Sequence, residues 1–176
     1  MATRLLKALT ETGNHAVGNL NSLKVKTVAH GAIVTGGDID NFTLVELDFN
    51  SEGERICKQL SDVSKKSYLI ATPEARYMGE LMSDFYNAEG ERARIVVLEP
   101  GYTRFETSAF QLANGIDEIK NGLKAHFDTS SKKFLIHDGT HEDYEKASAK
   151  FLVVSNEEDV QYTLGQPMVR FEVIEA

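Results

Sequence analysis

A short segment in the last third of the chain, HDGTHED at residues 137–143, has the residue types of a metal or hydrolase centre. His137 and His141 are four residues apart, and acidic residues lie between and after them. On a helix, two histidines at this spacing share one face and can bind a single metal ion. Whether this stretch does chemistry therefore depends on the element that carries it.

The preceding residues predict a β-hairpin instead of a helix. In LKAHFDTSSKKFLIHD, with DTSSKK as the turn, Phe127 faces Phe134 and Ala125 faces Ile136. One face of the hairpin is then apolar, and we expect Phe127, Phe134 and Ile136 to be buried. The same register places His137 on the opposite face, where we expect it to be largely exposed.

The second strand of this hairpin should end near Asp138, because Asp-Gly is a turn signal. Gly139 and the β-branched Thr140 also disfavour a helix that would hold both His137 and His141 on one face. HDGTHED is thus interpreted as the end of a strand followed by a turn.

A metal site without a helix remains an alternative. The hairpin register puts His126 and His137 diagonally on one face, where Asp143 or His141 could join them from the loop. Leu135 lies between the two histidines, however, and no second carboxylate is fixed nearby. We therefore interpret the histidines as solvated surface residues, and keep as the alternative function a metal-dependent hydrolase that uses His126, His137, His141 and Asp143.

Other catalytic chemistry has less support. Cys57 lies at apolar spacing with Ile56 and Leu60, which favours a buried packing thiol over a nucleophile. The sequence contains neither a G-x-S-x-G motif nor a glycine-rich phosphate loop, and its carboxylates show no acid–base pairing pattern. The sequence analysis therefore assigns no catalytic, cofactor-binding or metal-binding residue, and predicts a protein that is not an enzyme.

Composition narrows the classes of partner. The chain has 176 residues, a formal net charge of −8 and a single cysteine. Its lysines and arginines are scattered, so no basic stripe could follow a nucleic-acid backbone. The first residues lack the apolar run of a signal peptide, and the longest apolar runs are too short to span a bilayer. We expect one domain, intracellular when made, with neither nucleic acid nor membrane as a partner.

Most of the chain has the periodicity of β-strands. Alternating or β-rich runs predict strands at 42–49, 67–72, 93–98, 150–154 and 168–174. Thr72 and Pro73 begin a stretch with helical spacing up to Phe85, and 50–60 is expected to form another turn or two of helix. Segment 115–123 stays undecided between helix and loop. The predicted fold is mainly β, a small barrel-like or sandwich-like domain with one or two short helices.

Residues 1–24 differ from the single β-rich domain predicted over 25–176, and are interpreted as an extended N-terminal arm. The apolar cluster of this arm shares one face of a helical turn and is followed by an Asn- and Gly-rich stretch. The arm could dock on its own domain or on a neighbouring subunit, and both alternatives stay open. Its candidate partner-binding residues are Arg4, Leu5, Leu6, Lys7, Leu9, Asn14 and His15.

The segment DFYNAEGERARIVVLEPGYTRFETSAF, residues 84–110, resembles a segment of the head decoration (capsid cement) proteins of tailed bacteriophages. The matching positions are Phe85, Gly90, Glu91, Ala93, Arg94, Leu98, Gly101 and Phe105. The resemblance implies a non-enzymatic structural protein of the virion that needs no cofactor. The partners that the resemblance implies are the major capsid protein and copies of the chain itself, on the capsid surface after assembly in the host cytoplasm. A phage tail or head-to-tail connector component is the alternative within this class.

Overall fold

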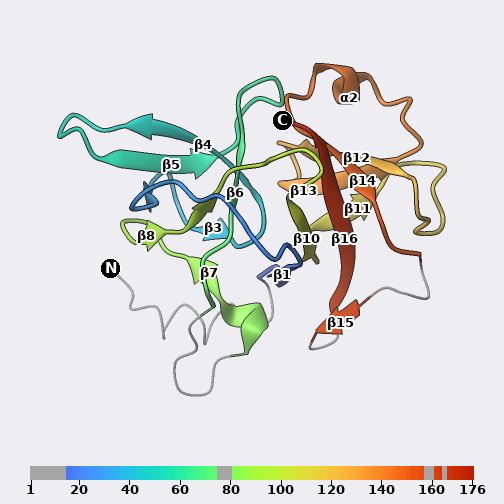
Figure 1. Ribbon diagram of the computed structural model, residues 1–176, viewed down its shortest axis with the longest axis horizontal. Coiled ribbons are helices and arrows are strands. Elements are labelled where there is room, and N and C mark those ends of the chain that lie inside the picture. Colours follow the sequence, from blue (N-terminus) through green and yellow to red (C-terminus); the bar gives the residue numbers. More distant parts are fainter. Residues whose placement is uncertain (1–14, 75–80, 157–160, 164–165) are drawn as a thin grey trace.

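The computed structural model describes residues 15–74, 81–156, 161–163 and 166–176 of the chain. Strands dominate these residues and form a large sheet beside a smaller one (Figure 1). The described helical elements are the 3-10 turn η1 (Met82–Asp84) and the short helix α2 (Glu142–Lys146). The prediction of a mainly β fold with few helices is confirmed.

The larger sheet is nearly closed into a barrel. Its strand order is β1 (Gly18–Leu20), β10 (Arg104–Thr107), β16 (Gln166–Glu175), β14 (Lys150–Val153), β12 (Lys124–Asp128), β13 (Lys133–His137) and β11 (Phe110–Leu112), and β15 (Gln161–Thr163) pairs with β16. Strands β10 and β11 are consecutive in the chain, yet β10 pairs with β16 while β11 pairs with β13. The segment that carries β10 and β11 therefore pairs with β16 at one end of the path β16-β14-β12-β13 and with β13 at the other end, which nearly closes the sheet.

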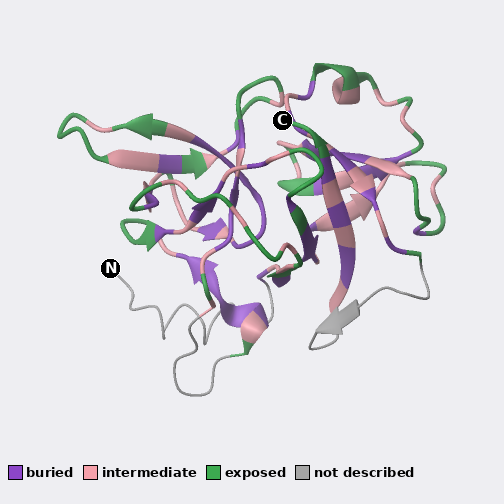
Figure 2. Ribbon diagram, viewed as in Figure 1, coloured by how far each residue is buried: buried purple, intermediate pink, exposed green. Residues whose placement is uncertain are grey.

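Aromatic rings fill the interior of this barrel. Phe134 lies 5.4 Å from Phe105 and 5.1 Å from Phe171, measured between ring centroids, and contacts two further phenylalanines, Phe127 and Phe151. Each of these rings comes from a different strand and is buried. Figure 2 shows the alternation that produces this core on β16, where buried positions follow intermediate ones.

The smaller sheet has the strand order β8 (Arg92–Ala93), β2 (Ala32–Val34), β5 (Arg55–Gln59), β4 (Leu44–Phe49), β6 (Tyr68–Ile70) and β9 (Ile95–Val96). Strands β3 (Ile39–Asp40) and β7 (Tyr86–Asn87) form a separate pair. Side chains of the smaller sheet, such as Leu44 and Leu69, belong to the same apolar cluster as Phe134 of the barrel. The two sheets therefore share a hydrophobic core.

Most of the predicted strands are present, but the helical prediction for 50–60 is wrong. Residues 55–59 form β5, which pairs with β4 from Phe49↔Arg55 to Val45↔Gln59. The side chain of Asn50 accepts hydrogen bonds from the backbone N–H groups of Glu52 and Glu54, and Gly53 has a φ of 79°. These features form the turn of a hairpin, so strand pairing outweighs the weak helical spacing.

The other two helical segments also differ from a regular helix. Residues 75–80 of the helix expected after Pro73 lie outside the described residues, and the described part near its end is the 3-10 turn at Met82. Segment 115–123, which the sequence left undecided, contains turns and no helix. Ile119 of this segment is nevertheless buried in the core.

Part of the predicted arm is a strand of the domain. β1 pairs antiparallel with β10, and Gly18 lies opposite Thr107. A Cβ atom at Gly18 would lie 2.3 Å from Cγ of Phe42 and 2.7 Å from the carbonyl oxygen of Glu106. Only glycine fits this gap, so β1 packs closely against both β10 and the residue Phe42 that precedes β4.

Candidate functional site

The hairpin β12–β13 positions the histidines, and its predicted register is confirmed. His126 pairs with Leu135, Phe127 with Phe134, and Lys124 with His137. Asp128 shapes the turn, because its carboxylate accepts hydrogen bonds from the backbone N–H groups of Ser130 and Ser131. Phe127, Phe134 and Ile136 are buried as expected.

The expected exposure of His137 is wrong. Only 2% of His137 is exposed, and its Nε2 lies 3.0 Å from Nδ1 of His126, which is 1% exposed. The residues after the hairpin fold back over this face, and the ring of Tyr144 packs 4.8 Å from that of His137. Strand alternation gave the correct side of the hairpin but could not show that the returning chain covers it.

The returning chain also brings His141 and Asp143 to His126. His141 is the N-cap of α2, and its Nδ1 accepts a hydrogen bond from the backbone N–H of Asp143 at 3.3 Å. The rings of His126 and His141 are 4.8 Å apart between centroids. One ligand atom from each of His126, His141 and Asp143 lies within 4.8 Å of the others. These three residues are named the histidine cluster below.

His137 stands next to the cluster as a hydrogen-bonding partner. The backbone N–H of Gly139 donates to Nδ1 of His137 at 2.9 Å. A neutral imidazole has one donor and one acceptor nitrogen, so Nε2 of His137 carries the proton and donates to Nδ1 of His126. The same rule places the proton of His126 on Nε2.

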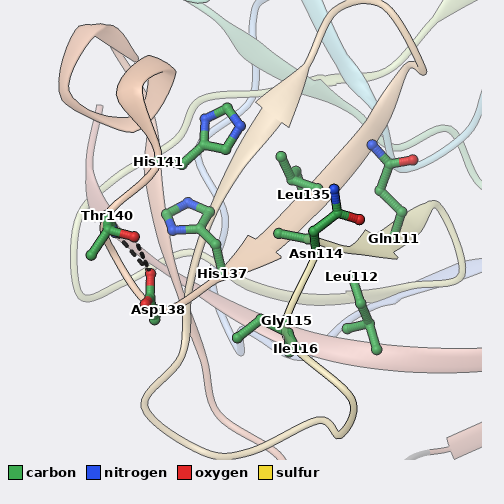
Figure 3. A pocket seen from close by; sticks show the side chains of 11 residues that line it. Gln111, Leu112, Asn114, Gly115, Ile116, Leu135, His137, Asp138, Thr140 and His141 are labelled. Carbon is green, nitrogen blue, oxygen red and sulfur yellow. Dashed lines mark hydrogen bonds between the residues drawn. The ribbon is translucent and has the colours of Figure 1, made fainter.

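Two surface pockets border the cluster. The first, of about 540 Å³, is lined by His137, His141 and the segment from Gln111 to Ile116. Figure 3 shows His137 and His141 on one side of this pocket, with Asn114 and Gln111 across from them. The second, of about 490 Å³, is lined by all three cluster residues and by further carboxylates, those of Asp62, Asp128 and Glu142.

Burial keeps the two inner histidines neutral. Burial is the main cause that lowers the pKa of His126 to about 4, and the neighbouring His137 and His141 contribute to the same shift. The carboxylates of Asp143 and Asp128 oppose it by a smaller amount. Burial also lowers the pKa of His137 to about 4, with His141 as the second cause. At neutral pH both rings are therefore uncharged, which is the form of imidazole that binds metals.

The loop that carries Asp62 is fixed by a buried carboxylate of the smaller sheet. Glu46 accepts a hydrogen bond from Ser61 at 3.0 Å and lies 3.0 Å from the ammonium groups of Lys58 and Lys65. Burial alone would raise the pKa of Glu46, but hydrogen bonds from Lys65, Lys58 and Ser61 outweigh it and lower the pKa to about 2. This ionised group holds the edge of the second pocket in place.

The candidate partner-binding residues of the arm are mostly outside the described part. Arg4, Leu5, Leu6, Lys7, Leu9 and Asn14 all lie in residues 1–14. His15 is described, and it is buried in its own domain: Nδ1 lies 2.6 Å from Oδ1 of Asp40, and the ring packs on Tyr86. The end of the arm nearest the domain is thus docked on the chain itself.

Two other polar features have structural roles. Cys57 is buried, and burial raises the pKa of its thiol to about 11, which agrees with a packing residue rather than a nucleophile. Glu106 is also buried and pairs with Arg170, whose Nε donates to its carboxylate at 2.8 Å. The sequence does not single out Glu106, because its partner Arg170 lies 64 residues away along the chain.

The comparisons with known proteins point to a phage. The family described as "YonC prophage protein" matches residues 11–174. A relative from Bacillus subtilis (strain 168), described as "SPbeta prophage-derived uncharacterized protein YonC", is 65% identical over 178 residues and covers 100% of both chains. No solved structure matches the chain. The chain therefore belongs to the YonC prophage protein family, and it is a phage protein with a barrel-like fold.

Among the described residues, none of the helices has the length and apolar character needed to cross a bilayer.

Proposed function

We propose that this chain is a non-enzymatic virion protein that binds the capsid shell by contacting the major capsid protein. Two findings support the proposal: membership of a prophage family over almost the whole chain, and the resemblance of residues 84–110 to head decoration proteins. The fold also exposes apolar side chains on neighbouring segments, and this is the observation that carries the proposal.

The residues behind the resemblance are parts of the core and of its turns. Phe85, Leu98 and Phe105 are buried, while Gly90 and Gly101 have positive φ angles of 85° and 73°. The backbone N–H of Gly101 donates to the carbonyl oxygen of Val173 at 2.9 Å. These positions therefore specify the fold, and the contact with a partner must come from other residues.

Three exposed apolar residues lie on segments that pair with one another: Leu23 follows β1, Tyr102 precedes β10, and Ile174 is on β16. Leu23 is fully exposed, Tyr102 is 77% exposed, and Ile174 is 38% exposed. Hydrogen bonds connect their segments. The hydroxyl of Ser22 donates to the carbonyl oxygen of Tyr102, and the backbone N–H of Gly101 donates to the carbonyl oxygen of Val173. We name Leu23, Tyr102 and Ile174 the apolar edge. Apolar side chains gathered on a surface are typical of a contact site for another protein.

The apolar edge is attached to the arm. Leu23 follows β1, and β1 follows residues 1–14, which contain Leu5, Leu6 and Leu9. A protein that contacts a shell at two linked places gains affinity, because the first contact raises the effective concentration of the second. A shell of repeated subunits offers the same pair of contacts many times.

The experiment mixes purified protein with shells of the major capsid protein from the same phage that lack this chain. Bound protein is measured by sedimentation of the shells. The double variant Leu23→Ser, Tyr102→Ser should lose at least tenfold in affinity. The control is Phe49→Ser, because Phe49 is also an exposed large apolar residue but lies on the β4–β5 hairpin of the other sheet. This control should bind as the wild-type protein does.

A second variant removes residues 1–14 and tests the contribution of the arm. Reduced occupancy with an unchanged fold, measured by circular dichroism, supports an arm that contacts the shell. The proposal fails if wild-type protein does not sediment with the shells, or if the double variant and the Phe49→Ser control bind alike. Binding only at one vertex, seen by electron microscopy, would instead indicate the tail or connector alternative.

A further inference from the structure

The histidine cluster joins strand β12 to helix α2. His126 is on β12, whereas His141 and Asp143 are the N-cap and an early residue of α2. Helix α2 has no buried residue, so hydrophobic burial contributes little to its position. The described ion pair from Lys146 to Asp143 lies within the helix, and α2 contacts the barrel through the ring of Tyr144, which lies against His126, His137 and the ammonium group of Lys150.

Two imidazoles and a carboxylate are a frequent ligand set for divalent transition metals, and imidazole distinguishes such sites from those of Mg²⁺ or Ca²⁺. In a tetrahedral zinc site the ligand atoms are roughly 3.4 Å apart. The cluster atoms lie within 4.8 Å of one another, so a bound ion requires them to approach by about 1.5 Å at most. Because α2 is short and unburied, it can make this movement without disrupting the core.

We propose that His126, His141 and Asp143 bind one divalent transition-metal ion of the Zn²⁺ type, and that this ion fixes helix α2 against strand β12. The site is a structural clip and is independent of the proposed contact with the capsid. The pocket that the cluster lines contains the further carboxylates Asp62 and Asp128, whose negative charge favours the entry of a cation.

His137 orients the buried ligand. If Nε2 of His126 binds the metal, its proton moves to Nδ1, which must then donate to Nε2 of His137. The proton of His137 moves in turn to Nδ1, where it faces the backbone N–H of Gly139. Two donors cannot share this hydrogen bond, so metal binding should break the contact of Gly139 and shift its amide NMR resonance. This shift is a readout that nonspecific surface binding would not produce.

The experiment uses untagged full-length protein, first treated with EDTA and then titrated with ZnCl₂. We expect one Zn²⁺ per chain by calorimetry and by elemental analysis, a rise of several degrees in the melting temperature, and slower hydrogen exchange of residues 142–146. The Gly139 amide resonance should shift in proportion to the bound metal.

Matched variants separate the site from its surroundings. His141→Asn keeps a side chain that caps a helix well but is a poorer ligand, and Asp143→Asn removes the charge without changing the shape. Each should weaken Zn²⁺ binding at least tenfold. The controls are His30→Asn, at an exposed histidine outside the cluster, and Glu145→Gln, at an exposed carboxylate of α2 that does not line the pocket; both should bind as the wild-type protein does.

Three results would overturn the proposal. The first is the absence of stoichiometric Zn²⁺ binding to the wild-type protein. The second is equal binding by the two cluster variants and the two controls. The third is one-to-one binding that leaves both the hydrogen exchange of α2 and the Gly139 resonance unchanged, because the ion would then not fix the helix.

Discussion

The two faces of the β12–β13 hairpin each bury side chains, but by different means. The inner face carries Phe127, Phe134 and Ile136, which other strands of the barrel cover. The outer face carries His126 and His137, which are buried where the returning chain packs on them through His141 and Tyr144. The alternation of side chains along the strands is enough to predict that the inner face is buried. The burial of the histidines on the outer face depends instead on the path of the chain after the hairpin. The same register thus predicts one face well and the other poorly.

The largest effect should come from the inner face. Phe134→Ala removes a ring that contacts four other phenylalanines in the barrel, and should destabilise the protein by roughly 3–5 kcal/mol. Urea denaturation followed by circular dichroism measures the difference. A loss below about 1 kcal/mol would mean that the interior is not packed as described.

The buried carboxylate of Glu46 differs from both faces of the hairpin, because its contribution to stability depends on its charge. The pKa of Glu46 is lowered from 4.5 to about 2 in the folded protein, so its contribution to stability is present above pH 4.5 and is lost as the pH falls towards 2. That contribution is about 3 kcal/mol at pH 7. The variant Glu46→Gln should be less stable at pH 7 and should lack this part of the acid-dependent loss. Urea melts from pH 7 to pH 2.5 test it, and parallel curves for both proteins would contradict the assignment.

The outer face should have an intermediate effect. His137→Ala removes the partner of Nδ1 of His126 and leaves that buried nitrogen without its hydrogen bond, at a cost of roughly 1–3 kcal/mol. His30→Asn is the control, because His30 is exposed and asparagine tolerates the positive φ of 59° at this position. Urea melts without added metal measure both variants. If both are close to neutral, the outer face is open in solution and the covering segment is not docked.

The smallest effect should come from the apolar edge. Leu23→Ser and Tyr102→Ser alter side chains that are exposed, so each should change the free energy of unfolding by less than about 0.5 kcal/mol. Thermal melts are sufficient to measure this. A large loss of stability would show that these residues pack on their own chain, and the apolar edge would no longer be a free contact surface.

Sequence patterns predicted the fold where side-chain alternation is strong. The run from Met168 to Ile174 and the hairpin around DTSSKK have clear period-two patterns, and both are strands in the predicted positions. The segment 50–60 has no such pattern, and its strand depends on pairing with β4 across the turn at Asn50. Pairing between distant or weakly patterned segments is a tertiary effect that a single sequence does not display.

The candidate site was predicted only in its parts. The sequence placed His126 and His137 on one face and named His141 and Asp143 as residues that could join them. It did not show α2, because Glu142–Lys146 is a single short helix that begins at a histidine, which is an uncommon N-cap. It also did not show Tyr144 as the cover of His137. Both depend on the path of the chain after Gly139.

We propose that the chain is a component of the virion surface, and quantitative mass spectrometry of particles purified after prophage induction, with the soluble lysate measured alongside, tests this claim. We expect the chain to stay with intact particles in a fixed ratio to the major capsid protein, and protease treatment of those particles to digest it before the capsid. If the chain is abundant in the soluble lysate but absent from purified particles, the claim is wrong.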